Sequence, residues 1–356
     1  MQNITYLVDE INKDKVQLPE NLVFGKLFTR HMFEMNYCNH EQGWTEPTIK
    51  PFENLSLSPA TTVFHYGQAI FEGLKAFRTV DGRIAMFRPD KHFQRLNNSA
   101  KKLCIPESDS ELLIEALKEL IKIEKNWVPT KNGTSLYIRP FIFGSDPFIG
   151  VHPSKQYKLL IILSPVGAYY PEGFKPVKIL TQDDYVRAVR KGLGDCKTSA
   201  NYAASLYAGE MAQERGFTQV LWLDGVEQKY IEEVGTMNIF IRFKDEIVTP
   251  KLTGSILPGI TRMTVLEMLK GWGENVTERL ISIDEVIEEY EKGNVLEIFG
   301  TGTAAVISPV GSLTFKDKEM VINNGQPGEM SLKLFDAITD IQYGRAEDTH
   351  NWLCYI

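Results

Sequence analysis

Two strand-like runs follow each other in the first half of the chain, TSLYIRPFIF (134–143) and YKLLIILSPV (157–166), and this succession most constrains the fold. A regular parallel sheet would alternate its strands with helices, whereas strands adjacent in sequence favour an α+β arrangement. Further short strands are predicted beyond residue 176, in VKIL, QVLWL, MNIFIRF and VLEIF. We therefore expect a mixed α/β protein of the α+β class.

Two helices are predicted between these strand regions. The first, within 88–103, carries apolar residues at helical spacing, namely Phe93, Leu96, Ala100 and Leu103. The second, SELLIEALKELIKIEKNW (110–127), is preceded by Ser108, which with Glu111 has the spacing of a capping box. Later helical patterns are ITRMTVLEMLKGW, DEVIEEYEK and GEMSLKLFDAITDIQYG.

A chain of 356 residues exceeds the ordinary size of a single core, so two domains are expected. The segment GAYYPEGFKP (167–176) combines two glycines, two prolines and three aromatic residues. This composition is typical of a linker or hinge.

The net charge and the cysteine content argue against several classes of partner. The 39 Lys and Arg residues against 46 Asp and Glu give a net charge of −7, with no long basic cluster, which disfavours nucleic acid and anionic membranes as partners. The four cysteines form no CxxC pair and no zinc-ligand spacing, so we expect no metal and a reducing compartment. With no signal-peptide pattern and no apolar run of ~20 residues, a cytoplasmic location is predicted.

Lys197 stands among small and weakly polar residues in DCKTSANYAAS (195–205). A surface loop would explain this on spacing alone, because lysines are mostly exposed. The alternative is that Lys197 points into a crowded site and reacts there.

The strand SLYIRPF places Tyr137 and Arg139 on one face by its period of two. That pair could bind a carboxylate through charge-assisted hydrogen bonds. An outward-facing polar surface of the strand explains the same pattern.

Two glycine-containing loops could present backbone amides to a phosphate. Pro258-Gly259 precedes a helical run, so the amides of Ile260 and Thr261 would lie at a helix N-terminus, and FGTGTAAVISP could form a similar nest. A helix cap and a tight turn explain both without a ligand. A P-loop is rejected because Ile260 stands where that motif requires lysine, and a dinucleotide GxGxxA at 300–305 is rejected because Pro309 would interrupt its helix.

Glu232 and Glu233 are adjacent carboxylates in YIEEVGTMNIF (230–240), before an apolar strand. Neighbouring residues of an extended segment point to opposite sides, so at most one would face a site. From spacing alone a solvated pair is the simpler interpretation.

Seven ordered blocks carry a resemblance that extends from about residue 25 to the C-terminus. They are HYGQAIFEGLKAFR (65–78), FRPDKHFQRLNNSAKKL (87–103), LYIRPF (136–141), DCKTSANYAAS, EVGTMNIF (233–240), LPGITR (257–262) and FGTGTAAVISPV (299–310). In this order they resemble branched-chain-amino-acid aminotransferases of the class IV pyridoxal-phosphate fold, which is also the D-amino-acid aminotransferase-like fold.

The resemblance implies pyridoxal 5'-phosphate as cofactor and assigns the residues that hold it. Lys197 matches the Schiff-base lysine and forms an aldimine, while Glu233, rather than Glu232, matches the partner of the pyridine nitrogen. Arg95 matches a phosphate-binding arginine, although it lies off the apolar stripe of its helix and reads as a surface residue. The remaining matches are Tyr202 at the ring oxygen and Ile260, Thr261 and Thr303 at the phosphate.

The implied reaction is reversible amino transfer between L-leucine, L-isoleucine or L-valine and 2-oxoglutarate, with Lys197 as general base. The matching substrate residues are Tyr66, Phe71, Tyr137, Tyr169, Arg139, Thr303 and Ala304. The family receives the substrate α-carboxylate largely on the turn containing Thr303 and Ala304. A direct bond from Arg139 to that carboxylate is therefore secondary, and Arg139 would serve the longer acidic substrate, glutamate.

The resemblance further implies two domains with the cofactor between them. We expect a smaller N-terminal α/β domain at 1–170, a linker at 171–183, and a larger domain at 184–356 that carries the lysine. It also implies a homodimer in which the loop around Ile149 helps to close the neighbour's pocket. Ala305 and Ser308 stand where some animal members place a redox CxxC, so no thiol switch is expected there. Cys196, next to Lys197, is a better target for oxidation, although a buried, inert thiol is the simpler interpretation.

Other activities of the same fold stay open at this point. A D-amino-acid aminotransferase or an aminodeoxychorismate lyase would share Lys197 and Glu233, and outside catalysis the chain could be an inactive binding protein. The match of HYGQAIFEGLKAFR and LYIRPF favours the branched-chain group.

Overall fold

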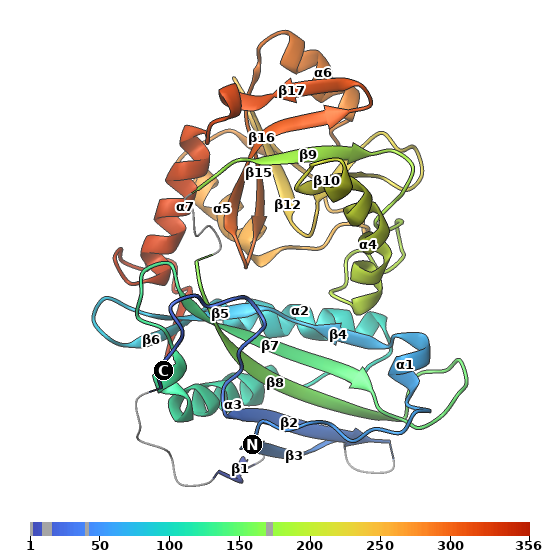
Figure 1. The fold of residues 1–356 in the computed structure, drawn as a ribbon, viewed down its shortest axis with the longest axis vertical. Helices are drawn as coiled ribbons and strands as arrows, with labels where there is room; N and C mark the ends of the chain where they lie inside the picture. Colours follow the sequence, from blue (N-terminus) through green and yellow to red (C-terminus); the bar gives the residue numbers. More distant parts are fainter. Residues whose placement is uncertain (1–2, 9–15, 40–42, 169–173) are drawn as a thin grey trace. The chain divides into compact units, whose positions relative to one another are not determined.

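The structure is a computed structural model that describes residues 3–8, 16–39, 43–168 and 174–356. The chain forms two compact units, each built on a nine-stranded sheet (Figure 1). The first unit contains residues 1–169, 196–199 and 340–356, and the second contains 170–195 and 200–339. In the parts of the chain that are described, no helix combines the length and apolarity needed to cross a membrane.

The sheet of the first unit is almost entirely antiparallel. Its order is β1-β3-β2-β8-β7-β5-β6-β18, and β4 also pairs with β7. The bounds are β1 (Thr5–Tyr6), β2 (His31–Cys38), β3 (Gly43–Pro51), β4 (Ala69–Phe71), β5 (Leu74–Arg78), β6 (Ile84–Phe87), β7 (Ser135–Gly144), β8 (Gln156–Val166) and β18 (Leu353–Tyr355). The predicted pair of adjacent strands is confirmed, because β7 and β8 pair from Ser135 with Val166 to Gly144 with Tyr157.

Helices α2 (Pro89–Lys102) and α3 (Ser110–Ile123) cover one face of this sheet, while α1 (Thr62–Tyr66) is a short helix before β4 (Figure 1). The predicted stripe of α2 is confirmed, since Phe93, Leu96 and Ala100 are buried in the core and Leu103 packs against it. The proposed capping box is wrong. Asp109, directly before the helix, accepts hydrogen bonds from the amides of Glu111 and Leu112, while the Ser108 hydroxyl bonds to Asn97.

The sheet of the second unit is mixed. Its order is β11-β10-β9-β16-β15-β12-β13-β14, with β17 paired to β16, and β9 is parallel to both its neighbours. The bounds are β9 (Val177–Gln182), β10 (Gln219–Leu223), β11 (Ile231–Val234), β12 (Asn238–Phe243), β13 (Ile247–Pro250), β14 (Val276–Arg279), β15 (Val295–Gly302), β16 (Val306–Phe315) and β17 (Lys318–Val321). The helices are α4 (Ser199–Glu214), α5 (Ile260–Gly271), α6 (Ile283–Glu291) and α7 (Glu329–Gln342).

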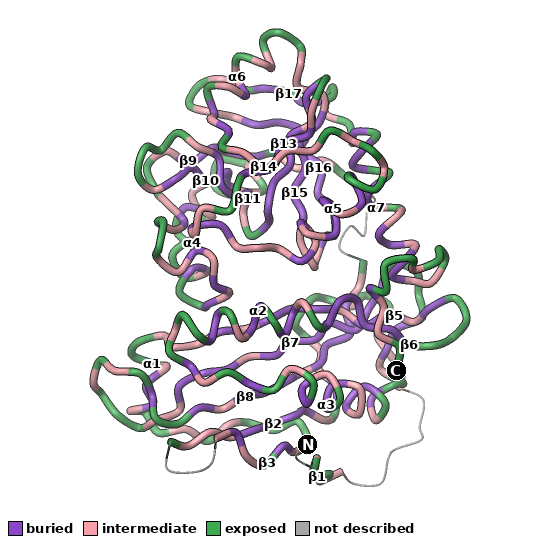
Figure 2. The backbone as a smooth tube through the Cα atoms, turned by 180° about the vertical axis from the view of Figure 1, so that it is seen from behind, coloured by how far each residue is buried: buried purple, intermediate pink, exposed green. Residues whose placement is uncertain are grey.

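The two units depart from the continuous ranges expected from the sequence. Residues 177–182 of the expected linker form β9, an interior strand of the second sheet that is largely buried (Figure 2). Residues 169–173 lie outside the described part. The C-terminal segment belongs to the first unit because β18 pairs with β6. Residues 196–199 also belong to it, through backbone bonds to β4 that form part of the site below.

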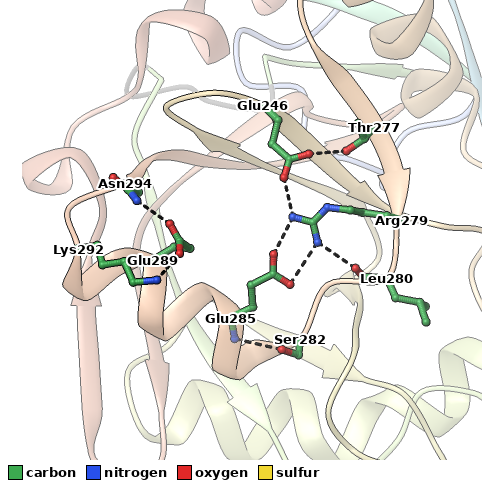
Figure 3. Close-up of polar contacts among 9 residues, drawn as sticks. All are labelled: Glu246, Thr277, Arg279, Leu280, Ser282, Glu285, Glu289, Lys292 and Asn294. Atoms are coloured by element: carbon green, nitrogen blue, oxygen red, sulfur yellow. Dashed lines mark hydrogen bonds and ion pairs between the residues drawn. The ribbon is translucent and has the colours of Figure 1, made fainter.

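An ion-pair network fastens one edge of the second sheet to α6 (Figure 3). Arg279, at the end of β14, donates to Glu246 at 2.7 Å and to Glu285 at 2.6 Å, and these bonds raise the pKa of the guanidinium. Thr277 bonds to the other oxygen of Glu246, and Ser282 caps α6. Each pair is partly exposed, so its separate contribution is modest, about 1 kcal/mol or less.

A buried carboxylate fixes the start of α7. Glu297 of β15 accepts from the amides of Met330 and Ser331, both at 2.9 Å, and pairs with Arg242 at 2.9 Å. These bonds satisfy helix amides that would otherwise have no partner, and they place a negative charge at the positive end of the helix.

Substitution Gly328→Ala should destabilise the protein, because the added Cβ would lie 1.9 Å from Cδ of Glu297 and displace the carboxylate that holds α7. We expect a loss of about 1–3 kcal/mol in the free energy of unfolding, measured by urea denaturation. The control is Gly271→Ala in α5, where a Cβ meets no atom within 4 Å. Equal midpoints for the two variants would contradict this account of α7.

Candidate active site

The Lys197 segment is anchored in the first unit by three hydrogen bonds, each of which involves a backbone group. The amide of Phe71 donates to the carbonyl of Lys197 at 3.0 Å, and the amide of Lys197 donates to the Ser99 hydroxyl at 3.0 Å. The Thr198 hydroxyl donates to the carbonyl of Ala69 at 2.8 Å. The segment is therefore held between β4 and α2, and the interpretation as a surface loop is wrong.

The amine of Lys197 lies in a cationic and aromatic environment. Its Nζ is 4.8 Å from the centre of the Phe71 ring, and the guanidinium carbon of Arg139 is 4.7 Å from the same centre. Burial, and then the charge of Arg95, lower the pKa of Lys197 to about 8. Close to neutral pH the amine is thus far more often uncharged than an exposed lysine, as a nucleophile or base requires.

Tyr137 and Arg139 lie together on the inside, so the interpretation as an outward-facing strand surface is wrong. Tyr137 is 8% exposed, and Arg139 donates to its hydroxyl at 2.9 Å. Gly73 leaves room for the ring, because a Cβ there would lie 2.0 Å from the Tyr137 hydroxyl oxygen. Phe71, Tyr137, Arg139 and Lys197 are therefore one cluster within the first unit.

Arg95 is buried, with 6% exposure, although periodicity places it off the apolar stripe. It forms a two-point ion pair with Glu72, from Nε to Oε1 at 2.7 Å and from Nη2 to Oε2 at 2.9 Å. His92 Nδ1 lies 2.7 Å from Glu72 Oε2. Sequence reasoning missed Glu72 and His92, and the available signal was a charged residue, Glu72, inside the apolar run of the block 65–78.

Two of the predicted substrate residues, Tyr66 and Tyr169, are not placed beside Lys197 by any contact in the described part of the chain. Tyr66 ends α1, is 42% exposed and lies beside the ring of His65. Tyr169 lies outside the described part of the chain.

Glu233 is buried at one end of the second unit's sheet. Its Oε1 accepts from the amide of Leu257 at 2.7 Å, and its Oε2 pairs with Arg187 Nε at 3.0 Å. Arg187 also donates to the carbonyls of Ser255 and Gly194. Sequence reasoning missed Arg187, since a single arginine in a loop carries no pattern.

A pocket opens beside this carboxylate within the second unit. Its lining consists of Arg187, Asn201, Tyr202, Ser205, Glu233, Gly235, Thr236 and Leu257. The predicted residues Glu233 and Tyr202 therefore share one pocket, which is polar and has an arginine and a carboxylate in its wall.

Glu232 occupies a different environment from its neighbour. It is 3% exposed against 2% for Glu233, so the interpretation as a solvated pair is wrong. The Ser255 hydroxyl donates to Glu232, and burial raises the pKa of this carboxyl. Of the two, only Glu233 lines the pocket.

The predicted phosphate loops lie at the start of α5 and between β15 and β16. Helix α5 begins at Ile260, as expected, with Gly259 as its N-cap. Thr303 and Ala304 form the turn after Gly302, and a strand follows that turn, which agrees with the rejection of a dinucleotide helix there. Asn238 connects the two regions, because it pairs with Thr301 and donates to the carbonyl of Leu257 at 2.8 Å.

Comparisons with known proteins agree with the fold expected from the seven sequence blocks. A family model described as amino-transferase class IV matches residues 69–313. The protein named branched-chain-amino-acid aminotransferase 2 of Bacillus subtilis (strain 168) is 56% identical over 334 residues, which cover 94% of this chain and 92% of the relative.

Solved structures show the same likeness. The branched-chain amino acid aminotransferase of Escherichia coli superposes with a TM-score of 0.76 at 28% identity, covering 91% of this chain and 98% of the other. A branched-chain amino acid aminotransferase from an organism abbreviated T.th., solved with pyridoxamine 5'-phosphate, gives 0.74 at 28% identity, covering 90% and 98%. The expected mixed α/β fold of the class IV aminotransferases is confirmed.

The lowered pKa of Lys197 can be measured by NMR on ligand-free protein with ¹³C-labelled lysine. We expect two Cε signals to titrate near pH 8, because burial also lowers the pKa of Lys75 to about 8. Lys197→Met should remove one signal and Lys75→Met the other, while exposed lysines titrate near about 10.4. A Lys197 signal that titrates with the exposed lysines would contradict the desolvation argument.

Proposed function

Because the chain belongs to the class IV aminotransferases, within their branched-chain-amino-acid group, we propose that Lys197 is the residue on which its amino transfer depends. The proposed substrates are L-leucine, L-isoleucine and L-valine with 2-oxoglutarate, and the proposed cofactor is pyridoxal 5'-phosphate. The observation that carries the assignment is the anchoring of the Lys197 segment between β4 and α2, with its amine beside Phe71.

The residues present suit this cofactor. Lys197 offers an amine with a lowered pKa, which an aldehyde requires of its partner. Glu233 offers a buried carboxylate in a pocket that also contains Tyr202, as a pyridine nitrogen and a ring oxygen require. Arg95, with Ile260, Thr261 and Thr303, would hold the phosphate.

When bound, pyridoxal 5'-phosphate supplies an electron-withdrawing ring that stabilises the charge left at the substrate Cα. Lys197 Nζ, whose pKa is lowered to about 8 by burial, would accept the proton that leaves Cα. Arg187 and the Leu257 amide hold the Glu233 carboxylate in place, and this carboxylate would hold the ring nitrogen of the cofactor.

We propose that Phe71 and Tyr137, together with Tyr66 and Tyr169, form the aromatic wall against the branched side chain. The 4.8 Å between Lys197 Nζ and the Phe71 ring supports this arrangement. The turn at Thr303 and Ala304 would receive the α-carboxylate, and Arg139, bonded to Tyr137, would serve the second carboxylate of glutamate.

We also propose a cytoplasmic homodimer in which the loop around Ile149 completes the neighbour's pocket. The exposure of three apolar residues of this loop supports the proposal, with values of 50% for Phe148, 65% for Ile149 and 89% for Val151. Burying them against a second copy would remove apolar surface from water.

The test is a titration of purified protein with L-leucine. The visible absorption of the bound cofactor should be bleached by L-leucine and restored by 2-oxoglutarate. Lys197→Ala should lose both the absorption and at least about a thousandfold in rate, as expected for a residue that is both attachment point and base. Lys75→Ala, which removes another amine of similar pKa in the same unit, should keep the absorption.

Two outcomes would contradict the assignment. Bleaching by D-alanine but not by L-leucine would overturn the substrate class. Transamination at the normal rate by Lys197→Ala would overturn the role of the lysine.

A further inference from the structure

Glu72 is a fully buried charged residue in the first unit, with 0% exposure. A buried carboxylate costs several kcal/mol unless donors surround it. Here the donors are Nε and Nη2 of Arg95, the Gly73 amide at 3.2 Å and His92, whose Nδ1 carries the hydrogen when the carboxylate is ionised. These partners hold the pKa of Glu72 well below its usual range.

The bond to Arg95 fixes an orientation as well as a charge. Two parallel bonds between a guanidinium and a carboxylate set the plane of the guanidinium, which a single contact does not. His92 and Arg95 are three residues apart on α2, and Ser99 is four residues further on, so all three lie on one face of the helix. The Ser99 hydroxyl accepts from the amide of Lys197.

Glu72 therefore lies between the Lys197 segment and Arg95 of α2. Phe71, the residue before it, donates its amide to the carbonyl of Lys197, while Glu72 itself holds Arg95. The Glu72 amide donates to the carbonyl of Pro140 at 2.7 Å, next to Arg139. The segment 71–72 thus sets the positions of both Lys197 and Arg95.

We propose that Glu72 is a positioning residue of the active site, which holds the Arg95 guanidinium in the orientation that receives the phosphate of the cofactor. The proposal rests on the proposed function, in which Arg95 binds that phosphate. Glu72 itself does not contact the cofactor in this role. Its effect reaches the cofactor only through Arg95.

The test compares the affinities of the full-length protein, freed of cofactor, for pyridoxal 5'-phosphate and for pyridoxal. Their ratio measures the contribution of the phosphate, and a general loss of stability would not change it. Glu72→Gln keeps the size and removes the charge, while Glu72→Asp keeps the charge and is too short to hold both nitrogens. We expect each folded variant to reduce the ratio by about tenfold or more, the size of one charge-assisted hydrogen bond.

Glu124→Gln is the matched control. Glu124 is also a buried carboxylate of the first unit, with 3% exposure, and it is paired with a histidine, since His31 Nδ1 lies 2.7 Å away. Removal of its charge should cost stability, visible in thermal unfolding, and leave the ratio unchanged. A control that lowers the ratio as much as the Glu72 variants would overturn the proposal.

Arg95→Gln separates the inference from the proposed function. If this variant keeps the wild-type ratio, Arg95 does not bind the phosphate, and the assignment of Arg95 fails together with the inference. If Arg95→Gln reduces the ratio and both Glu72 variants keep it within about threefold, only the inference fails. Should Glu72→Gln not fold, as judged by circular dichroism, Glu72→Asp decides by the same thresholds.

Discussion

The backbone bonds between β4 and the Lys197 segment are the interaction on which the rest of the site depends. Lys197 is separated from Phe71 by more than a hundred residues of chain, yet its carbonyl accepts from the Phe71 amide. The Lys197 amide also donates to the Ser99 hydroxyl, and a residue whose amide and carbonyl are both hydrogen-bonded can point its side chain in few directions. Here the side chain points toward an aromatic ring and two arginines. The chemistry of the amine is therefore a consequence of strand pairing in the first unit.

Each unit also buries a carboxylate beside an arginine, and the energetics of such pairs suggest why. A buried ion pair seldom stabilises a fold more than apolar residues of the same volume would, because both charges lose their hydration. The Glu72–Arg95 and Glu233–Arg187 pairs are thus not explained by the stability of the fold alone. They hold a charged side chain in one orientation, as the binding of an anion or of a ring nitrogen requires.

Sequence periodicity predicted the elements whose positions depend on the burial of apolar side chains. It did not predict the residues that are buried because a polar or charged partner surrounds them. The strands β7 and β8, the stripe of α2 and the start of α5 follow from local patterns. The burial of Arg95 does not, because its partner Glu72 is 23 residues away and only the fold brings them together. The candidate site was found instead from the order of seven sequence blocks, and the residues between those blocks, such as Arg187, were missed.

A lowered pKa does not by itself identify a reactive lysine. Lys75 and Lys197 both have a pKa lowered to about 8 by burial, and both belong to the first unit. Lys75 is a residue of β5 opposite Tyr137, in the regular register of the sheet. Lys197 stands between a strand and a helix, before the start of α4, beside Phe71 and within the field of Arg95 and Arg139. Desolvation favours the uncharged amine at either position, and at Lys197 the neighbouring cations add to this effect, while the hydrogen-bonded backbone holds the amine beside the Phe71 ring.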